Sequence, residues 1–256
     1  GVDRLQLYLD FEKPASADER ERLRALVRRR ANERVPVAQL VGRKEFWSMP
    51  LCVSADVLAP RPDTETLVAA ALERLPEVDA ESSILEIGTG SGAVALALAR
   101  ERPRARITAT DVSPAALKLA ARNARELGLA DRIELVEGPL YAPAAGRRFD
   151  LVLSNPPYLA DSERETLAPE LGHEPAVALF AGPDGLALLR ELVAHAREFL
   201  APGAGFALEL APAQAPTVAN WCREVGLEDV VTHRDFAGRA RVVSAREPLP
   251  PASELR

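Results

Sequence analysis

The chain has 256 residues, enough for one domain or two with a sizeable core. Its apolar fraction of 47% and charged fraction of 27% are those of an ordinary globular protein, and no apolar run reaches the roughly 20 residues that a membrane helix needs. The net charge of −6 argues mildly against a nucleic-acid partner, although a local basic patch is compatible with that total.

The cysteine and histidine usage argues against covalent or metal cross-links. Cys52 and Cys222 lie far apart, which predicts neither a disulfide framework nor a zinc site. The three histidines lack metal-ligand spacing, so we expect no metal. A reducing, cytoplasmic compartment fits this composition best, and we expect no membrane association.

Helices are predicted for the first part of the chain, residues 1–42. Leu5, Leu7 and Leu9 favour a short helix, and Ser16 to Glu19 is typical of a capping box that begins a second helix ending near Arg30. Leu23, Leu26 and Val27 then share one face of that second helix.

A β-hairpin linker is predicted for residues 43–60, where short apolar runs flank turn residues. The stretch Pro60-Arg61-Pro62-Asp63-Thr64-Glu65 follows, and either Asp63 or Thr64 is expected to cap a helix that ends near Leu75. Arg61 is held between two prolines, and the pattern leaves open whether it is structural or faces a site.

Strand and helix patterns alternate after a linker at residues 76–82. The predicted strands lie at 84–87, 107–110, 133–136, 149–154 and 206–210, with helices at 91–101, 114–127, 185–200 and 213–225 and two final strands near 229–232 and 241–244. This alternation predicts an α/β domain over residues 61–247, with a mainly parallel, Rossmann-like sheet covered on both faces. The tail, residues 248–256, is expected to be loose.

A glycine-rich segment, Glu86-Ile87-Gly88-Thr89-Gly90-Ser91-Gly92, lies where the first strand of that sheet passes into a helix. Glycines there let the backbone turn tightly and approach a ligand. Asp111 follows the second strand, where a carboxylate can accept hydrogen bonds from ribose hydroxyls. Gly88-x-Gly90-x-x-Ala93 also satisfies a dinucleotide fingerprint, so an NAD-type site stays open at this point.

The tetrapeptide Asn155-Pro156-Pro157-Tyr158 ends the fourth strand. By itself it is compatible with a strand followed by a proline turn. The carboxyl ends of parallel strands line one crevice, however, so Asn155 is expected beside the glycine segment and Asp111. The Asn155 side chain and the Pro156 carbonyl could then accept the two N–H bonds of a planar amide or amino group and aim its nitrogen at a methyl donor.

These segments resemble known enzymes. Glu86 to Gly92 with Asp111 is similar to the cofactor loop of S-adenosylmethionine-dependent methyltransferases, and Asn155-Pro156-Pro157-Tyr158 resembles the signature of those that methylate exocyclic or amide nitrogen. Five further segments resemble the protein-(glutamine-N5) methyltransferases of peptide chain release factors: Glu45-Phe46-Trp47, Arg61-Pro62-Asp63-Thr64-Glu65, Glu174-Pro175, Gly182-Pro183-Asp184-Gly185 and Asp235-Phe236-Ala237-Gly238. The resemblance runs from about residue 4 to residue 245.

The resemblance implies a class I methyltransferase sheet, mostly parallel with its last strand antiparallel. It implies S-adenosylmethionine as cofactor, bound by Glu86, Gly88, Thr89, Gly90, Ser91, Gly92, Asp111, Leu140 and Asn155. It implies that the glutamine of the Gly-Gly-Gln loop of a class 1 release factor is the substrate, held by Asn155, Pro156, Pro157 and Tyr158. We expect a monomer that binds the release factor and no nucleic acid.

Two departures from the family pattern carry expectations of their own. Pro139 stands where the family usually has an acidic residue near the adenine, which predicts weaker cofactor binding, and Leu140 offers only apolar contact there. The N-terminal helical domain is shorter than is usual in the family, so Gly1 is interpreted as a non-native residue ahead of Val2. Such a shortening would weaken release-factor binding more than cofactor binding.

Three other functions are kept as alternatives. A ribosomal-protein glutamine methyltransferase belongs to the same group, and Asp63-Thr64-Glu65 after Arg61-Pro62 disfavours it. A nucleic-acid adenine-N6 methyltransferase presents similar amino-group geometry, and the acidic charge balance argues against it. A cofactor-binding module without activity is the third, favoured only by Pro139 and the shortened N-terminus.

Overall fold

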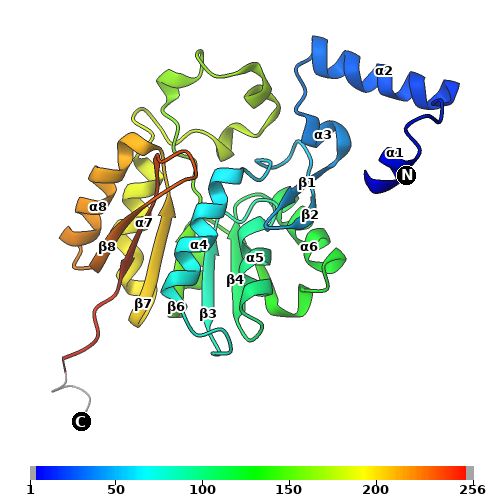
Figure 1. Ribbon diagram of the computed structural model, residues 1–256. Coiled ribbons are helices and arrows are strands. Elements are labelled where there is room, and N and C mark those ends of the chain that lie inside the picture. The colour runs from blue at the N-terminus through cyan, green and yellow to red at the C-terminus, as the bar shows by residue number, and fades with distance from the viewer. Residues whose placement is uncertain (1–3, 252–256) are drawn as a thin grey trace.

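A seven-stranded sheet forms the centre of the computed structural model, which describes residues 4–251 (Figure 1). Its strands lie in the order β5-β4-β3-β6-β7-β9-β8. They are β3 (Ser83–Ile87), β4 (Arg106–Asp111), β5 (Ile133–Glu137), β6 (Phe149–Ser154), β7 (Leu200–Glu209), β8 (Glu228–Arg234) and β9 (Ala240–Arg246). Among these seven strands, β9 alone runs opposite to the other six, so its pairs with β7 and β8 are antiparallel. The predicted fold class is confirmed, including the antiparallel last strand.

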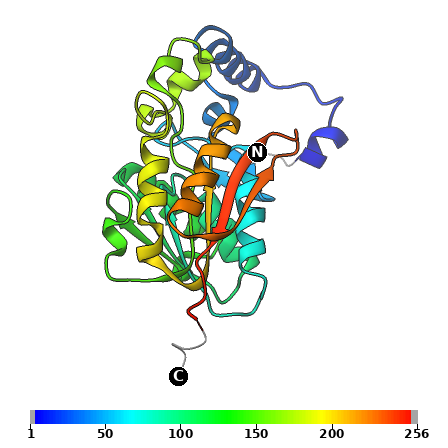
Figure 2. The same ribbon diagram turned by 90° about the vertical axis from the view of Figure 1, so that its left-hand side faces the viewer.

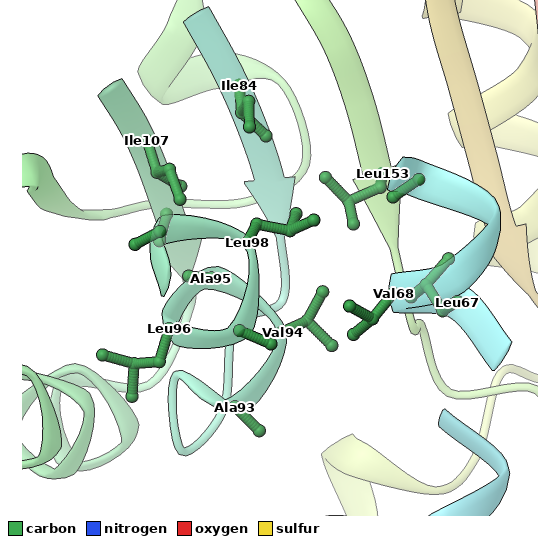
Figure 3. Packing of buried hydrophobic residues seen from close by; sticks show 14 of the residues in the cluster. Leu67, Val68, Ile84, Ala93, Val94, Ala95, Leu96, Leu98, Ile107 and Leu153 are labelled. Atoms are coloured by element: carbon green, nitrogen blue, oxygen red, sulfur yellow. The ribbon is translucent and has the colours of Figure 1, made fainter. Parts of the chain in front are cut away.

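Helices cover both faces of this sheet because its central strands are apolar on both sides. On one face, α4 (Glu65–Arg74), α5 (Ala93–Glu101) and α6 (Pro114–Glu126) contribute to a core with strand residues such as Ile84 and Leu153. Figure 3 shows α5 wedged between the strands and α4, with Val94 toward Val68. On the other face lie α7 (Ala187–Phe199) and α8 (Ala215–Glu224).

The predicted hairpin is present as β1 (Arg43–Phe46) and β2 (Met49–Cys52), which pair antiparallel. A short helix, α3 (Val37–Val41), precedes it. The expectation that Asp63 or Thr64 caps α4 with its side chain is wrong: α4 follows the 3₁₀ turn Pro62–Thr64 and has no side-chain cap. Both side chains are instead engaged by distant parts of the fold, as described below.

The first two helices stand apart from the sheet (Figures 1 and 2). They are α1 (Arg4–Leu9) and α2 (Ala17–Asn32), and the capping box of Ser16 and Glu19 is confirmed. α2 has no buried residue, and on its apolar face Leu23 is 61% and Val27 56% exposed. The interpretation of Gly1 concerns a position outside the described residues, and so does the expectation of a loose tail for residues 252–256.

A long segment between β6 and α7 lies at the same end of the molecule as α2 and α3 (Figures 1 and 2). It contains three 3₁₀ turns at Asp161–Glu163, Pro169–His173 and Ala176–Ala178. Two arginines of the N-terminal part, Arg30 and Arg34, both reach Glu170 Oε1, at 2.8 and 2.7 Å. Through this loop, the N-terminal segment is therefore attached at the carboxyl end of β6. Between residues 4 and 251, no helix has the length and apolar character that crossing a membrane requires.

Candidate functional site

A cavity of about 340 Å³ opens at the carboxyl ends of β3, β4 and β6. The sheet order changes direction between β3 and β6, which is where open α/β sheets bind ligands. The cavity is lined by most of the residues that the sequence singled out: Glu86, Gly88, Thr89, Gly90, Ser91, Asp111, Pro139, Leu140, Asn155, Pro156 and Pro157.

The glycine segment turns from β3 into α5 with its backbone facing the cavity. Gly88 and Gly90 have φ values of 74° and 55°, a left-handed conformation that residues with a Cβ rarely adopt. A Cβ at either position would meet no atom within 4 Å, so the space above both residues is open. The amides of Gly88 and Thr89 both donate to the Thr110 carbonyl at 2.9 Å, which anchors the turn on β4.

Asp111, at the end of β4, is held by two backbone amides. Gly90 N donates to Oδ2 and Ser113 N donates to Oδ1, each over 2.9 Å. A carboxylate has about four lone-pair sites, so both oxygens keep acceptor capacity toward the cavity. The glycine turn and Asp111, which were expected at the ends of neighbouring strands, are thus joined by a direct hydrogen bond.

Glu86 begins the segment from a buried position at the end of β3, 3% exposed. Its Oε2 accepts from the Thr89 hydroxyl at 2.6 Å and from Ala95 N at 3.1 Å. Burial raises the pKa of Glu86 to about 8, while these two hydrogen bonds act in the opposite direction. Glu86 therefore carries its proton over much of the neutral range.

Asn155 follows β6, which lies on the other side of β3 from β4 and Asp111. Its Nδ2 donates to the hydroxyl of Thr64 over 3.2 Å. The end of β6 is fixed by the hydroxyl of Ser154, which donates to the Ile87 carbonyl at 2.7 Å. Pro156 and Pro157 line the cavity beside Asn155 with rigid backbone.

Two of the sequence-selected residues do not line the cavity. Gly92 begins α5 with φ 81°, and a Cβ there would lie 3.2 Å from the Cβ of Ala120, so this glycine allows close packing of α5 on α6. Tyr158 is partly buried and packs against the core on the side of α7 and α8. Burial, followed by the negative field of Glu209, raises its phenol pKa to about 12. Its carbonyl accepts a hydrogen bond from Gln214 Nε2 at 2.9 Å.

Pro139 and Leu140 form the wall after β5. Leu140 has φ 46°, and Gly138 N donates to the Asp111 carbonyl at 3.0 Å, so this turn is held beside Asp111. Neither side chain has a polar atom. The wall is therefore apolar at the position where the family resemblance implies a carboxylate.

Arg61 has both of the roles that the sequence left open. It lines the cavity, and its guanidinium pairs with Glu174, whose side chain is fully buried. Burial raises the pKa of Glu174 although Arg61 favours the charged form. Glu174 also accepts from Ala59 N at 3.2 Å, so the pair joins the proline-rich linker to the long loop after β6.

Sequence reasoning missed several further residues at the site. Those from other elements include Val57, Leu58, Thr64, Ser113, Pro175 and Leu192. Thr64 was interpreted as a helix cap, and its tertiary contact has no local signal. Glu209, buried behind Thr64 and Tyr158, could have been found, because it ends a predicted parallel strand just as Asp111 does.

The strand order, the glycine turn bonded to an acidic residue after the next strand, and the Asn-Pro-Pro-Tyr segment define a class I methyltransferase. Residues 63–184 match the family of the methyltransferase small domain, and residues 1–42 match the PrmC N-terminal domain. The chain is 42% identical to the release factor glutamine methyltransferase of Geobacter sulfurreducens over 247 residues, which cover 96% of this chain and 85% of that protein. It is 43% identical to that of Deinococcus radiodurans over 246 residues, covering 96% and 86%. The chain belongs to the family of release factor glutamine methyltransferases.

A solved structure supports the fold independently of close sequence similarity. A methyltransferase from Pyrococcus furiosus matches with a TM-score of 0.58 at 18% identity, over 91% of this chain and 100% of that one. At this identity the match bears on the fold alone. It agrees with the class of sheet that the resemblance implied. The named relatives are methyltransferases and do not favour the NAD-type alternative.

Proposed function

We propose that this chain transfers a methyl group from S-adenosylmethionine to the side-chain amide nitrogen, N5, of the glutamine in the Gly-Gly-Gln loop of a class 1 peptide chain release factor. The observation that carries the proposal is the shared cavity of the glycine turn, Asp111 and Asn155. The named activity of relatives more than 40% identical over nearly the whole chain supports the choice of substrate.

The residues around the glycine turn fit an S-adenosylmethionine molecule. Open space above Gly88 and Gly90 suits the methionine portion, and the remaining acceptor capacity of Asp111 suits two ribose hydroxyls. Glu86, Thr89 and Ser91 belong to the same turn, and Leu140 offers an apolar surface for the adenine. When bound, this cofactor supplies an electrophilic methyl group on a sulfonium.

The residues around Asn155 fit a planar amide. An amide nitrogen is a poor nucleophile because its lone pair is delocalised, so its orientation and electrostatic surroundings decide the rate. Asn155 Oδ1 and the Pro156 carbonyl would accept its two N–H bonds, which draws electron density to the nitrogen. Pro157 keeps this segment stiff. The transfer would release S-adenosylhomocysteine and one N–H proton of the amide; the methylated nitrogen is acidic, so water can take this proton and no strong general base is required. The role expected for Tyr158, shaping the slot, stays a prediction.

The alternatives have less support. The ribosomal-protein and adenine-N6 activities are not favoured by the named relatives, and the net charge of −6 does not favour a nucleic-acid substrate. We propose that the enzyme acts in the cytoplasm as a monomer, with the release factor as its protein partner and no direct nucleic-acid contact.

The decisive experiment incubates the chain with S-adenosylmethionine and a class 1 release factor and measures the mass of the Gly-Gly-Gln peptide. We expect an increase of one methyl group on the glutamine, dependent on the cofactor and lost in Asn155→Ala. Asn220→Ala, an exposed asparagine on α8, is the matched control and should retain activity. Absence of the mass shift with the wild-type chain contradicts the proposal.

A further inference from the structure

The side-chain amide of Asn155 has a donor end and an acceptor end. For the proposed function, the acceptor end, Oδ1, must face the cavity to receive an N–H of the substrate amide. Nδ2 of Asn155 donates to Thr64 Oγ1 over 3.2 Å, which leaves Oδ1 at the other end of the amide, free of Thr64. Thr64 itself is 4% exposed and lines the cavity from the start of α4.

Thr64 cannot orient the amide without help. A hydroxyl both donates and accepts, so it would satisfy either end of an asparagine amide equally well. If the Thr64 hydroxyl donates its proton to another group, it can only accept a hydrogen bond from Asn155. The asparagine must then turn its NH₂ group toward Thr64. The orientation of Asn155 therefore depends on what accepts the Thr64 proton.

Glu209 is the acceptor that the fold supplies. It ends β7 with 1% exposure, and its Oε2 is buried without a hydrogen-bond partner among the described residues. The hydroxyls of Thr64 and Tyr158 and the guanidinium of Arg241 all favour its charged form, whereas burial opposes it and Asp63 adds to that opposition. Where Glu209 is ionised it has no proton to donate, so a Thr64 hydroxyl that pairs with it must be the donor.

We propose that Thr64, with its hydroxyl proton held by Glu209, is a positioning residue that turns the Oδ1 of Asn155 toward the substrate amide. In this arrangement the chain of donors runs in one direction, from Asn155 Nδ2 to Thr64 Oγ1 and from the Thr64 hydroxyl to the Glu209 carboxylate. This explains why Thr64 does not cap α4 although it stands at the N-cap position. It also explains why the fold contains the buried carboxylate of Glu209, although burying a carboxylate is costly.

Thr64→Val tests the proposal, because valine keeps the shape of threonine and removes the acceptor. Methylation of the release-factor glutamine is measured near pH 8, since burial raises the pKa of Glu209 to about 7 and the carboxylate prevails above that value. We expect kcat to fall about tenfold or more, while the Kd for S-adenosylhomocysteine, measured by calorimetry, stays within about twofold. Thr64→Ser should restore most of kcat.

Two further variants separate this role from a structural one. Glu209→Gln keeps the shape of the buried side chain and adds a donor, so it should also lower kcat without changing the Kd. Thr232→Val changes an exposed threonine on the edge strand β8 and should leave both quantities unchanged. Wild-type kcat in Thr64→Val, or an equal loss in Thr64→Ser, overturns the proposal.

Selective ¹⁵N-asparagine labelling gives a readout that does not depend on turnover. The chain has four asparagines, Asn32, Asn123, Asn155 and Asn220, so four side-chain NH₂ pairs are expected. The Asn155 pair is identified by its absence in Asn155→Ala. It should shift in Thr64→Val and in Glu209→Gln and keep its position in Thr64→Ser.

An unshifted Asn155 pair in Thr64→Val overturns the proposal whatever the enzyme methylates. If the wild-type chain leaves the release factor unmodified, the proposed function fails, and the NMR measurement still decides whether Thr64 holds the Asn155 amide. Should Thr64→Val fail to fold, Glu209→Gln provides the same comparison. The two failures are therefore distinguishable.

Discussion

Glu86 is a carboxylic acid kept largely neutral at the start of a ligand-binding turn. Burial raises its pKa to about 8 from an ordinary 4.5. An acid with a folded pKa above its unfolded value binds its proton more tightly in the folded state. Its contribution to stability is therefore fully present below about pH 4.5 and is lost as the pH rises toward 8. The glycine turn is thus built around a group whose ionisation opposes folding.

Replacing Glu86 with glutamine removes this ionisation and keeps an acceptor for the Thr89 hydroxyl. Between about pH 6 and about pH 8, the free energy of unfolding of the wild-type protein should fall by roughly 2 kcal/mol more than that of Glu86→Gln. Urea unfolding of both proteins at the two pH values measures the difference. Because Glu209 titrates in both proteins, its effect cancels. Parallel pH dependences would contradict the assigned burial cost.

Pro139 leaves the wall after β5 without a polar side-chain atom, beside the backbone that contacts Asp111. We expect Pro139→Asp to lower the Kd for S-adenosylhomocysteine by about tenfold, because a carboxylate can accept a hydrogen bond from the adenine amino group. Calorimetry measures this Kd. Ala145→Asp, an exposed site outside the cavity, adds the same charge as a control. Equal changes in both variants would point to net charge instead of a specific contact.

At the scale of elements, the site depends on contacts that join segments far apart in the chain. Asp63, at the start of α4, accepts from Arg239 at 2.9 Å and from Arg241 at 3.1 Å, which fixes this helix to β9 and the turn before it. The turn Gly182-Pro183-Asp184-Gly185 lies against the carbonyl of Tyr158, and a Cβ on Gly185 would overlap that oxygen. The positions of the segments at the cavity thus depend on contacts with distant neighbours as well as on their own sequence.

Asn123 makes the clearest of these connections. From a buried position on α6, its Oδ1 accepts from Cys52 N at 2.8 Å, and its Nδ2 donates to the carbonyls of Cys52 at 3.1 Å and Ser91 at 2.9 Å. It therefore joins the hairpin to the glycine turn. Replacing it with an apolar residue of similar size leaves three buried backbone groups without a partner.

We expect Asn123→Leu to lower the free energy of unfolding by roughly 3 kcal/mol, since each unpaired buried group costs about 1 kcal/mol or more. The Kd for S-adenosylhomocysteine should rise in the same variant, because Ser91 belongs to the glycine turn. Urea unfolding and calorimetry measure the two effects. Asn220→Leu, exposed on α8, should change stability by less than about 0.5 kcal/mol. A similar loss in both variants would contradict the connecting role.

At the scale of the whole molecule, the N-terminal helices contribute little to the core. α2 buries no side chain, and the described contacts of its end are ion pairs and hydrogen bonds with the loop after β6. The same loop supplies Glu174, which pairs with Arg61, and Pro175, which lines the cavity. We propose that this exposed apolar face of α2 takes part in binding the protein substrate.

The double variant Leu23→Ser/Val27→Ser tests this proposal. Both side chains are more than half exposed, so we expect the free energy of unfolding to change by no more than about 1 kcal/mol and the Kd for S-adenosylhomocysteine to stay the same. The kcat/KM for the release factor should fall by about tenfold. Val78→Ser, an exposed valine in the linker before β3, is the control. Unchanged kcat/KM would exclude this face from substrate binding.

Periodicity and local motifs in the sequence determined the elements and the class of fold. Near-continuous apolar strands that alternate with amphipathic helices bury their apolar surface in a mainly parallel sheet with helices on both faces. The glycine turn, Asp111 and Asn155 could be predicted to meet because the carboxyl ends of parallel strands share one edge. These inferences need only spacing and residue type, and the structure agrees with them: the sheet is mainly parallel and the three features line one cavity.

Only the tertiary structure decided which side chains support that site. Thr64 and Asp63 have the local chemistry of helix caps. In the structure Thr64 instead accepts a hydrogen bond from Asn155, and Asp63 accepts from the arginines of β9 and its preceding turn. Tyr158 does not line the cavity in this structure and its hydroxyl pairs with Glu209, so its expected role in shaping the substrate slot stays a prediction. Hydrogen bonds between residues 91 to 178 positions apart cannot be predicted from local sequence, because packing of the whole sheet brings the partners together.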